Sequence, residues 1–281
     1  LRADRLDLQA LAQIANRLPL GTATHAALLA HAPKGQIETL EASWQGKLID
    51  LKQYAVKGRV AALELAAQAS GTPGVKGLNL DFSATQVGGQ AKILLKSGSI
   101  ELPGILSDPV TAFDEIAANA TWQISGKALS AEIKQLKFAN ADTQGTGDVR
   151  WQTSDPSTSS SRSRFPGILD AQVQLSRGDA KRVHHYLPTT MSQEVRDYVR
   201  DAIVQGDLNL VKFRLKGDIN DMPAAPGRPV EFYISAQAQN VIYNYAPNPL
   251  PGAPTGDPLL AWPALAQLSG ELVFNGNLMQ I

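Results

Sequence analysis

The segment from Gly206 to Asp218, GDLNLVKFRLKGD, constrains the fold more than any other, because its side chains alternate between apolar and basic. The alternating residues are Val211, Phe213 and Leu215 on one side and Lys212, Arg214 and Lys216 on the other. Successive side chains of a β-strand point to opposite faces of its sheet. The pattern therefore predicts a strand with one apolar face and one basic, solvated face.

Two helices are expected before this strand. Residues 191–204 carry apolar side chains at helical spacing, and Thr190 and Gln193 have the spacing of a capping box. Gly206 can end that helix in a left-handed turn. A shorter helix is expected at about 179–187, where a Leu-Pro pair stops it.

Similar alternation recurs along the rest of the chain. Strands are expected at 36–44, 48–56, 60–67, 78–83, 91–95, 120–124, 129–133, 149–151, 169–175, 232–238 and 268–274. Gly46 and Gly58 are expected to break strands, and Gly88-Gly89 to turn a hairpin. Another helix is expected at 7–18, and a helical turn around 113–118. The class is therefore mainly β with a few helices.

Two stretches resemble each other and suggest an internal duplication. GQIETLEASWQG (Gly35–Gly46) and GDLNLVKFRLKG (Gly206–Gly217) are bounded by glycines at the same separation, and each follows an expected helix that ends in Leu-Pro. We therefore expect a first module at 1–152, a Ser-rich linker or loop at 153–164 and a second, truncated module at 165–281. The alternative is chance, because β-rich chains often reuse glycine and alternation.

Composition narrows the function classes. The chain has 26 basic and 26 acidic residues, so no net charge draws it to nucleic acid. It has no cysteine, which excludes disulfides and thiolate metal sites. Its 43% hydrophobic residues can form a core, yet no window is apolar for the roughly 18 residues that a membrane-spanning helix needs.

Sites for chemistry are not apparent. Motifs of hydrolases, zinc proteases, nucleotide-binding loops and dinucleotide folds are absent. His184 and His185 are adjacent, so they should leave a helix on different sides and form a poor metal pair. Asp218 and Asp221 are expected in a turn. We expect no enzyme activity, no catalytic residue, no metal and no cofactor.

At this point the residues identify a family. Residues 182–223, RVHHYLPTTMSQEVRDYVRDAIVQGDLNLVKFRLKGDINDMP, resemble the central region of the YhdP family of AsmA-like proteins. The helix ending in Leu-Pro-Leu at 2–20, the Gly-led strand at 35–44, the hairpin at 73–89 and the signature AWPALAQLSGELVFNG at 261–276 are also similar. The chain departs from the family pattern at its Ser-rich stretch and at a Pro-rich loop, 246–258.

The resemblance implies a long protein of Gram-negative bacteria, anchored in the inner membrane and projecting through the periplasm. Its repeated modules would form long, curved, twisted antiparallel sheets, a groove whose apolar face is capped by helices. The family is associated with moving phospholipid towards the outer membrane and with its permeability barrier. Implied partners are phospholipid acyl chains, both membranes through the rest of the protein, and other envelope proteins, but no nucleic acid.

The one-sided strands supply candidate residues for contact with acyl chains. The candidates are Leu78, Leu80, Phe82, Val211, Phe213, Leu215, Phe232, Ile234, Leu272 and Phe274. A competing hypothesis is a closed β-sandwich in which apolar faces bury each other, serving as a structural spacer or protein-docking module of the envelope. Only the open groove would leave these residues accessible to lipid.

Overall fold

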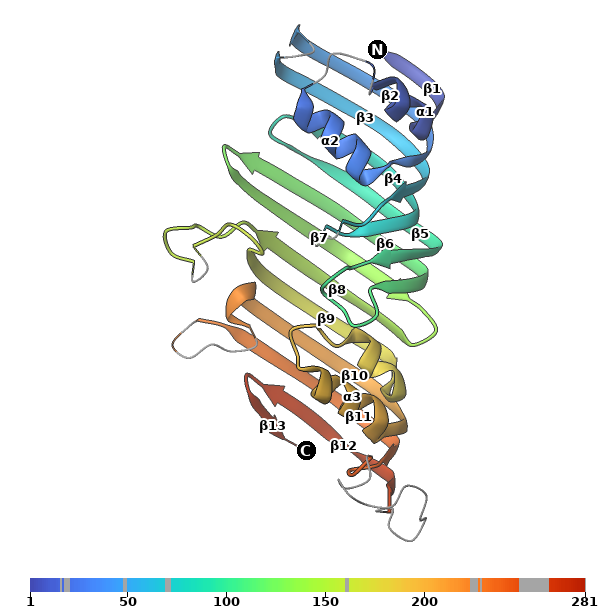
Figure 1. The fold of residues 1–281 in the computed structure, drawn as a ribbon, viewed down its shortest axis with the longest axis vertical. Helices are drawn as coiled ribbons and strands as arrows, with labels where there is room; N and C mark the ends of the chain where they lie inside the picture. The colour runs from blue at the N-terminus through green and yellow to red at the C-terminus, as the bar shows by residue number, and fades with distance from the viewer. Residues whose placement is uncertain are drawn as a thin grey trace.

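The computed structural model describes residues 1–15, 17, 21–47, 50–68, 72–159, 162–222, 227, 229–247 and 263–280. Within these ranges the chain forms one sheet of 13 antiparallel strands whose spatial order follows their order in sequence (Figure 1). The first and last strands do not pair with each other, so the sheet is open. The predicted class, mainly β with a long antiparallel sheet, is confirmed.

Most strands are 10 to 16 residues long, about twice the usual length, so the sheet is wide as well as long. The first eight are β1 (Arg2–Asp7), β2 (Lys34–Lys47), β3 (Asp50–Leu65), β4 (Gly74–Thr85), β5 (Gly88–Glu101), β6 (Val110–Ser125), β7 (Ala128–Ala139) and β8 (Thr143–Gln152). The others are β9 (Ile168–Asp179), β10 (Ile203–Asp218), β11 (Glu231–Tyr243), β12 (Leu265–Asn275) and β13 (Leu278–Gln280).

Cross-strand register places apolar residues and one glycine of nine successive strands in a single row. This central apolar row consists of Gly58, Phe82, Ala91, Ala120, Ile133, Val149, Ala171, Leu215 and Phe232, each directly opposite the next. Directly opposed residues project from the same face of a sheet. One face is therefore continuously apolar from β3 to β11, as the alternation predicted.

Seven of the described strands contain a non-glycine residue with left-handed backbone geometry that interrupts regular pairing. These residues are Arg5, Ala62, Ser97, Gln135, Leu210, Asn240 and Gln267. Several coincide with register shifts, as at Ala62 in β3 and Gln135 in β7. A bulge bends its strand and shifts the alternation by one residue, so Val60 and Leu63, three apart, share one cluster. The sheet curls at one margin, towards its helices (Figure 1).

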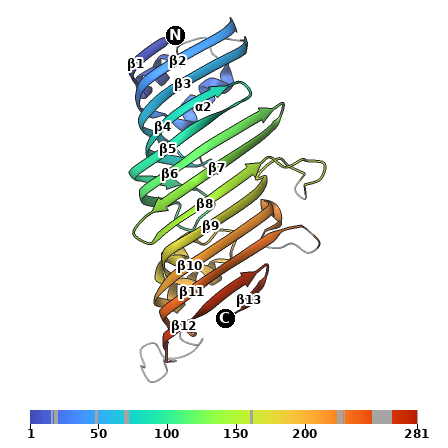
Figure 2. The same ribbon diagram turned by 180° about the vertical axis from the view of Figure 1, so that it is seen from behind.

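All but one of the described helices lie on this apolar face. The helices are α1 (Leu8–Ala15), α2 (Thr22–His31), α3 (Gln193–Ala202) and the 3-10 helices η1 (Ala180–Tyr186) and η2 (Ile219–Asp221), of which α2 and α3 stand before the sheet in Figure 1 and behind it in Figure 2. In α1, Leu8 and Leu11 pack against the core cluster of Ile37, Val60 and Leu63. The exception is η2, which lies at the opposite end of β10 from η1 and α3.

The two margins of the sheet differ. One, the helix margin, carries α1 and α2 between β1 and β2, the connection 102–109 between β5 and β6, and η1 and α3 between β9 and β10. The other, the turn margin, carries two-residue turns at 86–87 and 126–127, and the longer loop between β8 and β9. A meander requires this arrangement, because alternate connections fall at opposite ends of the strands.

The two stretches that suggested a duplication occupy equivalent positions. Each begins near the start of a long strand, β2 or β10, that follows a helical connection. Their bounding glycines all have positive φ: 126° at Gly35, 102° at Gly46, 155° at Gly206 and 129° at Gly217. This shared geometry supports the likeness of the two stretches, while the division into two modules remains a prediction.

Several local predictions are wrong. Gly58 does not break a strand but lies inside β3, and residues 113–118 form part of β6 rather than a helical turn. The hairpin between β4 and β5 turns at 86–87, so Gly88 and Gly89 belong to β5. Ser192, not Thr190, caps α3, accepting a 3.4 Å hydrogen bond from the N–H of Val195.

Other predicted boundaries move as well. The helix expected at 7–18 is α1, preceded by a strand that was not expected, and Leu18 lies outside the described residues. Helix α3 passes directly into β10, so Gly206 lies within a strand instead of ending a helix. Leu48 and residues 248–258 of the Pro-rich loop also lie outside the described residues.

The closed-sandwich hypothesis is wrong for this fold. The described residues form one sheet, and no second sheet packs on its apolar face. Helices and connections cover parts of that face instead, as α1 does over the Ile37 cluster.

Candidate functional site

The ten predicted lipid-contact residues lie in β4, β10, β11 and β12. Leu80 and Phe82 join the apolar face through their partners in β5, Ile93 and Ala91. The residues of β10 to β12 form cross-strand pairs, Leu215 with Phe232, Phe213 with Ile234, and Ile234 with Phe274. Leu78 alternates with Leu80, and Leu272 with Phe274. The ten share a face, but β5 to β9 separate them into two groups.

Exposure differs among the ten. Nine are half-buried, so part of each of these residues remains accessible to solvent. Val211 is only 3% exposed, and it is therefore covered rather than available to a ligand. The remaining nine stay candidates for contact with an apolar ligand.

The intervening strands supply residues that the sequence analysis did not select. Ile93, Ala120, Ile133, Val149 and Val173 lie on the same face and are half-buried. They connect the β4 group to the β10 group without a charged side chain in the row. The signal was present in the sequence, since each occupies an alternate position in its strand, but alanine and glycine among their neighbours make it weaker.

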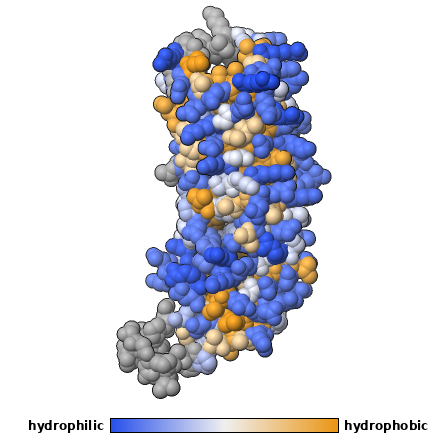
Figure 3. All heavy atoms as spheres, turned by 90° about the vertical axis from the view of Figure 1, so that its right-hand side faces the viewer, coloured by the Kyte–Doolittle hydropathy of each residue, from blue (hydrophilic) through white to orange (hydrophobic). Residues whose placement is uncertain are grey.

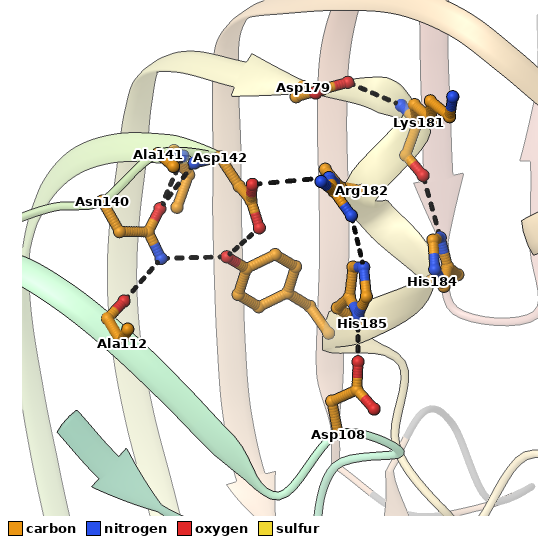
Figure 4. A network of polar contacts seen from close by, with 12 residues as sticks. Asp108, Ala112, Asn140, Ala141, Asp142, Asp179, Lys181, Arg182, His184 and His185 are labelled. Carbon is orange, nitrogen blue, oxygen red and sulfur yellow. Dashed lines mark hydrogen bonds and ion pairs between the residues drawn. The ribbon is translucent and has the colours of Figure 1, made fainter.

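At the helix margin, two distant connections clasp each other. The connection 102–109 joins residues 187–189 through a β-bridge between Leu106 and Pro188, and through a 2.9 Å hydrogen bond from the N–H of Thr189 to the carbonyl of Ile105. The His185 imidazole also contacts the Asp108 carboxylate (Figure 4). This clasp ties the β5–β6 connection to the β9–β10 connection.

A polar network beneath the clasp holds η1 to the turn between β7 and β8 (Figure 4). The amide of Asn140 donates to the carbonyl of Ala112 at 3.2 Å and to the Tyr186 hydroxyl at 3.0 Å, and that hydroxyl donates to Asp142 at 3.1 Å. Burial raises the pKa of Tyr186, so its hydroxyl stays protonated and can donate. The network anchors η1 at the helix margin.

The two histidines of η1 are closer together than predicted. Their ring centroids lie 4.0 Å apart with planes tilted by 35°, so the expectation that they leave the helix on different sides is wrong. Burial lowers the pKa of His184. Among the described residues no group of three or more histidine or acidic side chains is arranged to hold a metal ion.

The opposite face of the sheet is polar and its charges are compensated. Glu132 pairs with Arg150 at 2.7 Å and with Lys134 at 3.1 Å, and these contacts lower its pKa, the Arg150 hydrogen bond most. The Arg214 guanidinium pairs with Asp170 and lies 3.4 Å from Glu231. Two of the three basic residues in β10, Lys212 and Lys216, are exposed, as expected of a solvated face.

A hollow of about 760 Å³ opens at the turn margin, lined mostly by side chains of this polar face. The loop after β8 borders it, where Ser154 and Ser159 donate to the Asp218 carboxylate at 2.8 and 2.9 Å. Asp218 caps η2, and Asp221 is buried at the end of that turn. Both carboxylates therefore occupy the turn that the sequence predicts for them.

The surface at the helix margin carries apolar patches that are interrupted by a dense polar region (Figure 3). Helices and connections cover parts of the apolar face of this open sheet, and the opposite face carries compensated charges. These features define an open β-groove fold, with one long antiparallel sheet that is apolar on one face and polar on the other. Among the described helices, none is long and apolar enough to cross a bilayer.

Comparison with known families agrees with this class. The family model described as YhdP protein matches residues 1–281. The chain therefore belongs to the YhdP family and is an AsmA-like protein, which confirms the resemblance seen in the sequence. No curated protein and no solved structure matches the chain.

Proposed function

We propose that this chain is a periplasmic segment of a lipid conduit that carries phospholipid between the inner and outer membranes and supports the outer-membrane permeability barrier. The observation that carries the proposal is the central apolar row, continuous across nine strands and half-exposed over much of its length. Membership of the YhdP family supports it.

The energetics favour such a role. Exposing an acyl chain to water costs about 0.8 kcal/mol per CH₂, or on the order of 10 kcal/mol for a whole chain. Contacts with residues such as Ile133, Val149 and Phe213 would remove much of that cost. Because apolar contacts are non-directional, a chain displaced by one strand spacing finds an equivalent surface. Lipid could thus move along the sheet without a large barrier at any strand.

The polar face would keep the conduit in solution. Acidic and basic side chains alternate from strand to strand on this face and form ion pairs, as in Glu132–Arg150 and Asp170–Arg214. Such a face neither attracts a polyanion nor buries lipid. The predicted absence of enzyme activity is part of the proposal, so lipid should leave the groove chemically unchanged.

Photocrosslinking in the full-length protein tests this function. A photoreactive amino acid at Ile133 or Phe213 should form adducts with phospholipid in native membranes. The matched controls are the adjacent positions Lys134 and Lys212, which project from the polar face and should form few adducts. Equal or greater phospholipid adducts at the two lysine positions would overturn the proposal.

A further inference from the structure

The tryptophans among the described residues lie at one margin of the apolar face. The three described ones, Trp44, Trp122 and Trp151, occupy the last four residues of β2, β6 and β8, where those strands reach the turn margin. Trp122 and Trp151 face the same way, because both are opposite Ala131 in β7. Trp44 is opposite Tyr54 and alternates with Ala42, whose partner Val56 is on the apolar face. The indoles therefore border the apolar face at one edge.

Local packing fixes two of these indoles. A Cβ on Gly89 would lie 2.4 Å from a ring carbon of Trp122, so this ring rests directly on the β5 backbone. The Trp151 ring stacks on Phe165 with centroids 6.0 Å apart, and its Nε1–H donates to the Pro166 carbonyl at 2.7 Å. Indole has a large apolar body and one polar N–H, so it suits a boundary between hydrocarbon and water.

Basic side chains adjoin this boundary. The β6–β7 turn and the β8–β9 loop contribute Lys127, Arg162 and Arg164 but one acidic residue, Asp155. Arg164 donates to the Lys127 carbonyl at 3.0 Å, which brings the two segments together. None of these three basic residues takes part in an ion pair within the described residues, whereas Asp155 accepts from the N–H and hydroxyl of Ser157.

At the helix margin, His185 pairs with Asp108 and Arg182 with Asp142, whereas Arg177 and Arg196 donate to backbone carbonyls and Lys181 is exposed without an ion pair among the described residues. At the turn margin, an anion would meet Lys127 and Arg164 close together, with two indoles of the apolar face beside them. We infer that the turn margin holds the phosphate headgroup of a phospholipid beside Lys127 and Arg164. The indoles of Trp122 and Trp151 then mark the glycerol level, and the acyl chains lie along the central apolar row.

This inference rests on the proposed function and specifies the lipid class and its orientation. Each charge near an anionic lipid surface contributes about five-fold in affinity. The full-length protein should therefore label a phosphatidylglycerol with a photoreactive acyl chain more strongly than a diacylglycerol with the same chains. The K127Q/R164Q variant should reduce this preference by about five-fold or more, because it removes both charges and leaves the apolar face intact.

The K92Q/K212Q variant is the matched control, since it removes two exposed lysines from the polar face and should keep the wild-type preference. Equal labelling by both lipids in the wild type, or an unchanged preference in K127Q/R164Q, would overturn the headgroup site but leave the conduit standing. Labelling by neither lipid would instead overturn the conduit itself and the headgroup site with it.

A second measurement reports on depth. In a full-length W44F/W262F variant, tryptophan fluorescence comes from Trp122, Trp151 and any tryptophan elsewhere in the protein. Adding W122F/W151F to this variant gives the emission of those other tryptophans, which is then subtracted. Phospholipid brominated near its ester groups should quench this emission more than phospholipid brominated at its chain ends. Stronger quenching by the chain-end bromines would place the headgroup elsewhere and contradict the inference.

Discussion

The backbone N–H of Gln135 donates a 2.9 Å hydrogen bond to Oδ1 of Asp148, across the gap that a bulge opens between β7 and β8. Ala62 in β3 has the same relationship with Oδ1 of Asn79 in β4, at 3.2 Å. In both places a residue with positive φ leaves the regular ladder, and a side chain of the next strand accepts its N–H. The sheet is thus bent at positions whose polar groups remain satisfied.

Replacing Asp148 by alanine should therefore destabilise the sheet, because the N–H of Gln135 loses its acceptor. The bond is exposed, so water can replace it in part, and the expected loss is about 0.5–1.5 kcal/mol in the free energy of unfolding. Denaturant unfolding of D148A measures it. The control D148N keeps an acceptor oxygen and should lose less; equal losses in both variants would contradict this role.

Gly89 should not tolerate a side chain. Its Cβ would lie 2.4 Å from the Trp122 ring and 2.6 Å from the carbonyl of Ser83, so G89A must displace the indole or the strand. Overpacking of this kind costs about 1–3 kcal/mol. Thermal unfolding should show the loss, and tryptophan emission should shift. In G270A, where a Cβ would meet no atom within 4 Å, neither quantity should change; no change in G89A would refute the assigned packing.

The sequence predicts which side chains share a face of the sheet, because the alternation of apolar and polar residues is a property of each strand alone. The period-2 pattern of Val211, Phe213 and Leu215 is sufficient to predict one apolar face, and the register confirms that face in β10 and its neighbours. Pairing in sequence order then extends it across the sheet. What alternation could not reveal is that the connections cover only part of this face, since their positions depend on contacts such as Leu106 with Pro188.

One clear error concerns residues 113–118, where a helical turn was expected. They belong to β6, in which Ile116 is the cross-strand partner of Phe138 in β7 and the Phe113 ring contacts the Phe138 ring with centroids 6.4 Å apart. The pairing with β5 and β7 that makes this segment a strand is not visible in its local sequence. Helix α2 was missed for a different reason, because its sequence TATHAALLAH has no clear apolar stripe and buries little.

Low pH should reduce the stability of the folded sheet, because it protonates Asp170 on the polar face. The hydrogen bond from Arg214 lowers the pKa of this carboxyl in the folded state below its usual value near 3.8. A carboxyl with a depressed folded pKa contributes stability that is complete above the unfolded pKa and is lost as the pH falls through the folded pKa. In D170N, the unfolding temperature should decline less steeply between about pH 4 and pH 2. An unchanged slope would show that this pair does not couple folding to protonation.

A carboxylate placed on the apolar face should block the proposed conduit, whereas one on the polar face should not. Val173 lies in β9 opposite Gly147 and Phe213 on the apolar face, and its neighbour Gln172 projects from the other face beside Arg214. A charge that contacts acyl chains must lose hydration at a cost of several kcal/mol or be protonated. The amount of phospholipid that co-purifies with full-length V173D should therefore be lower than with wild type by about ten-fold or more.

The Q172D variant adds the same charge one residue away and should retain wild-type amounts of lipid, as measured by mass spectrometry of the extract. Unfolding temperatures of both variants must show that the sheet is intact, because a collapsed sheet would also release lipid. If folded V173D kept as much phospholipid as Q172D, the apolar face of β9 would not be the path along which acyl chains lie.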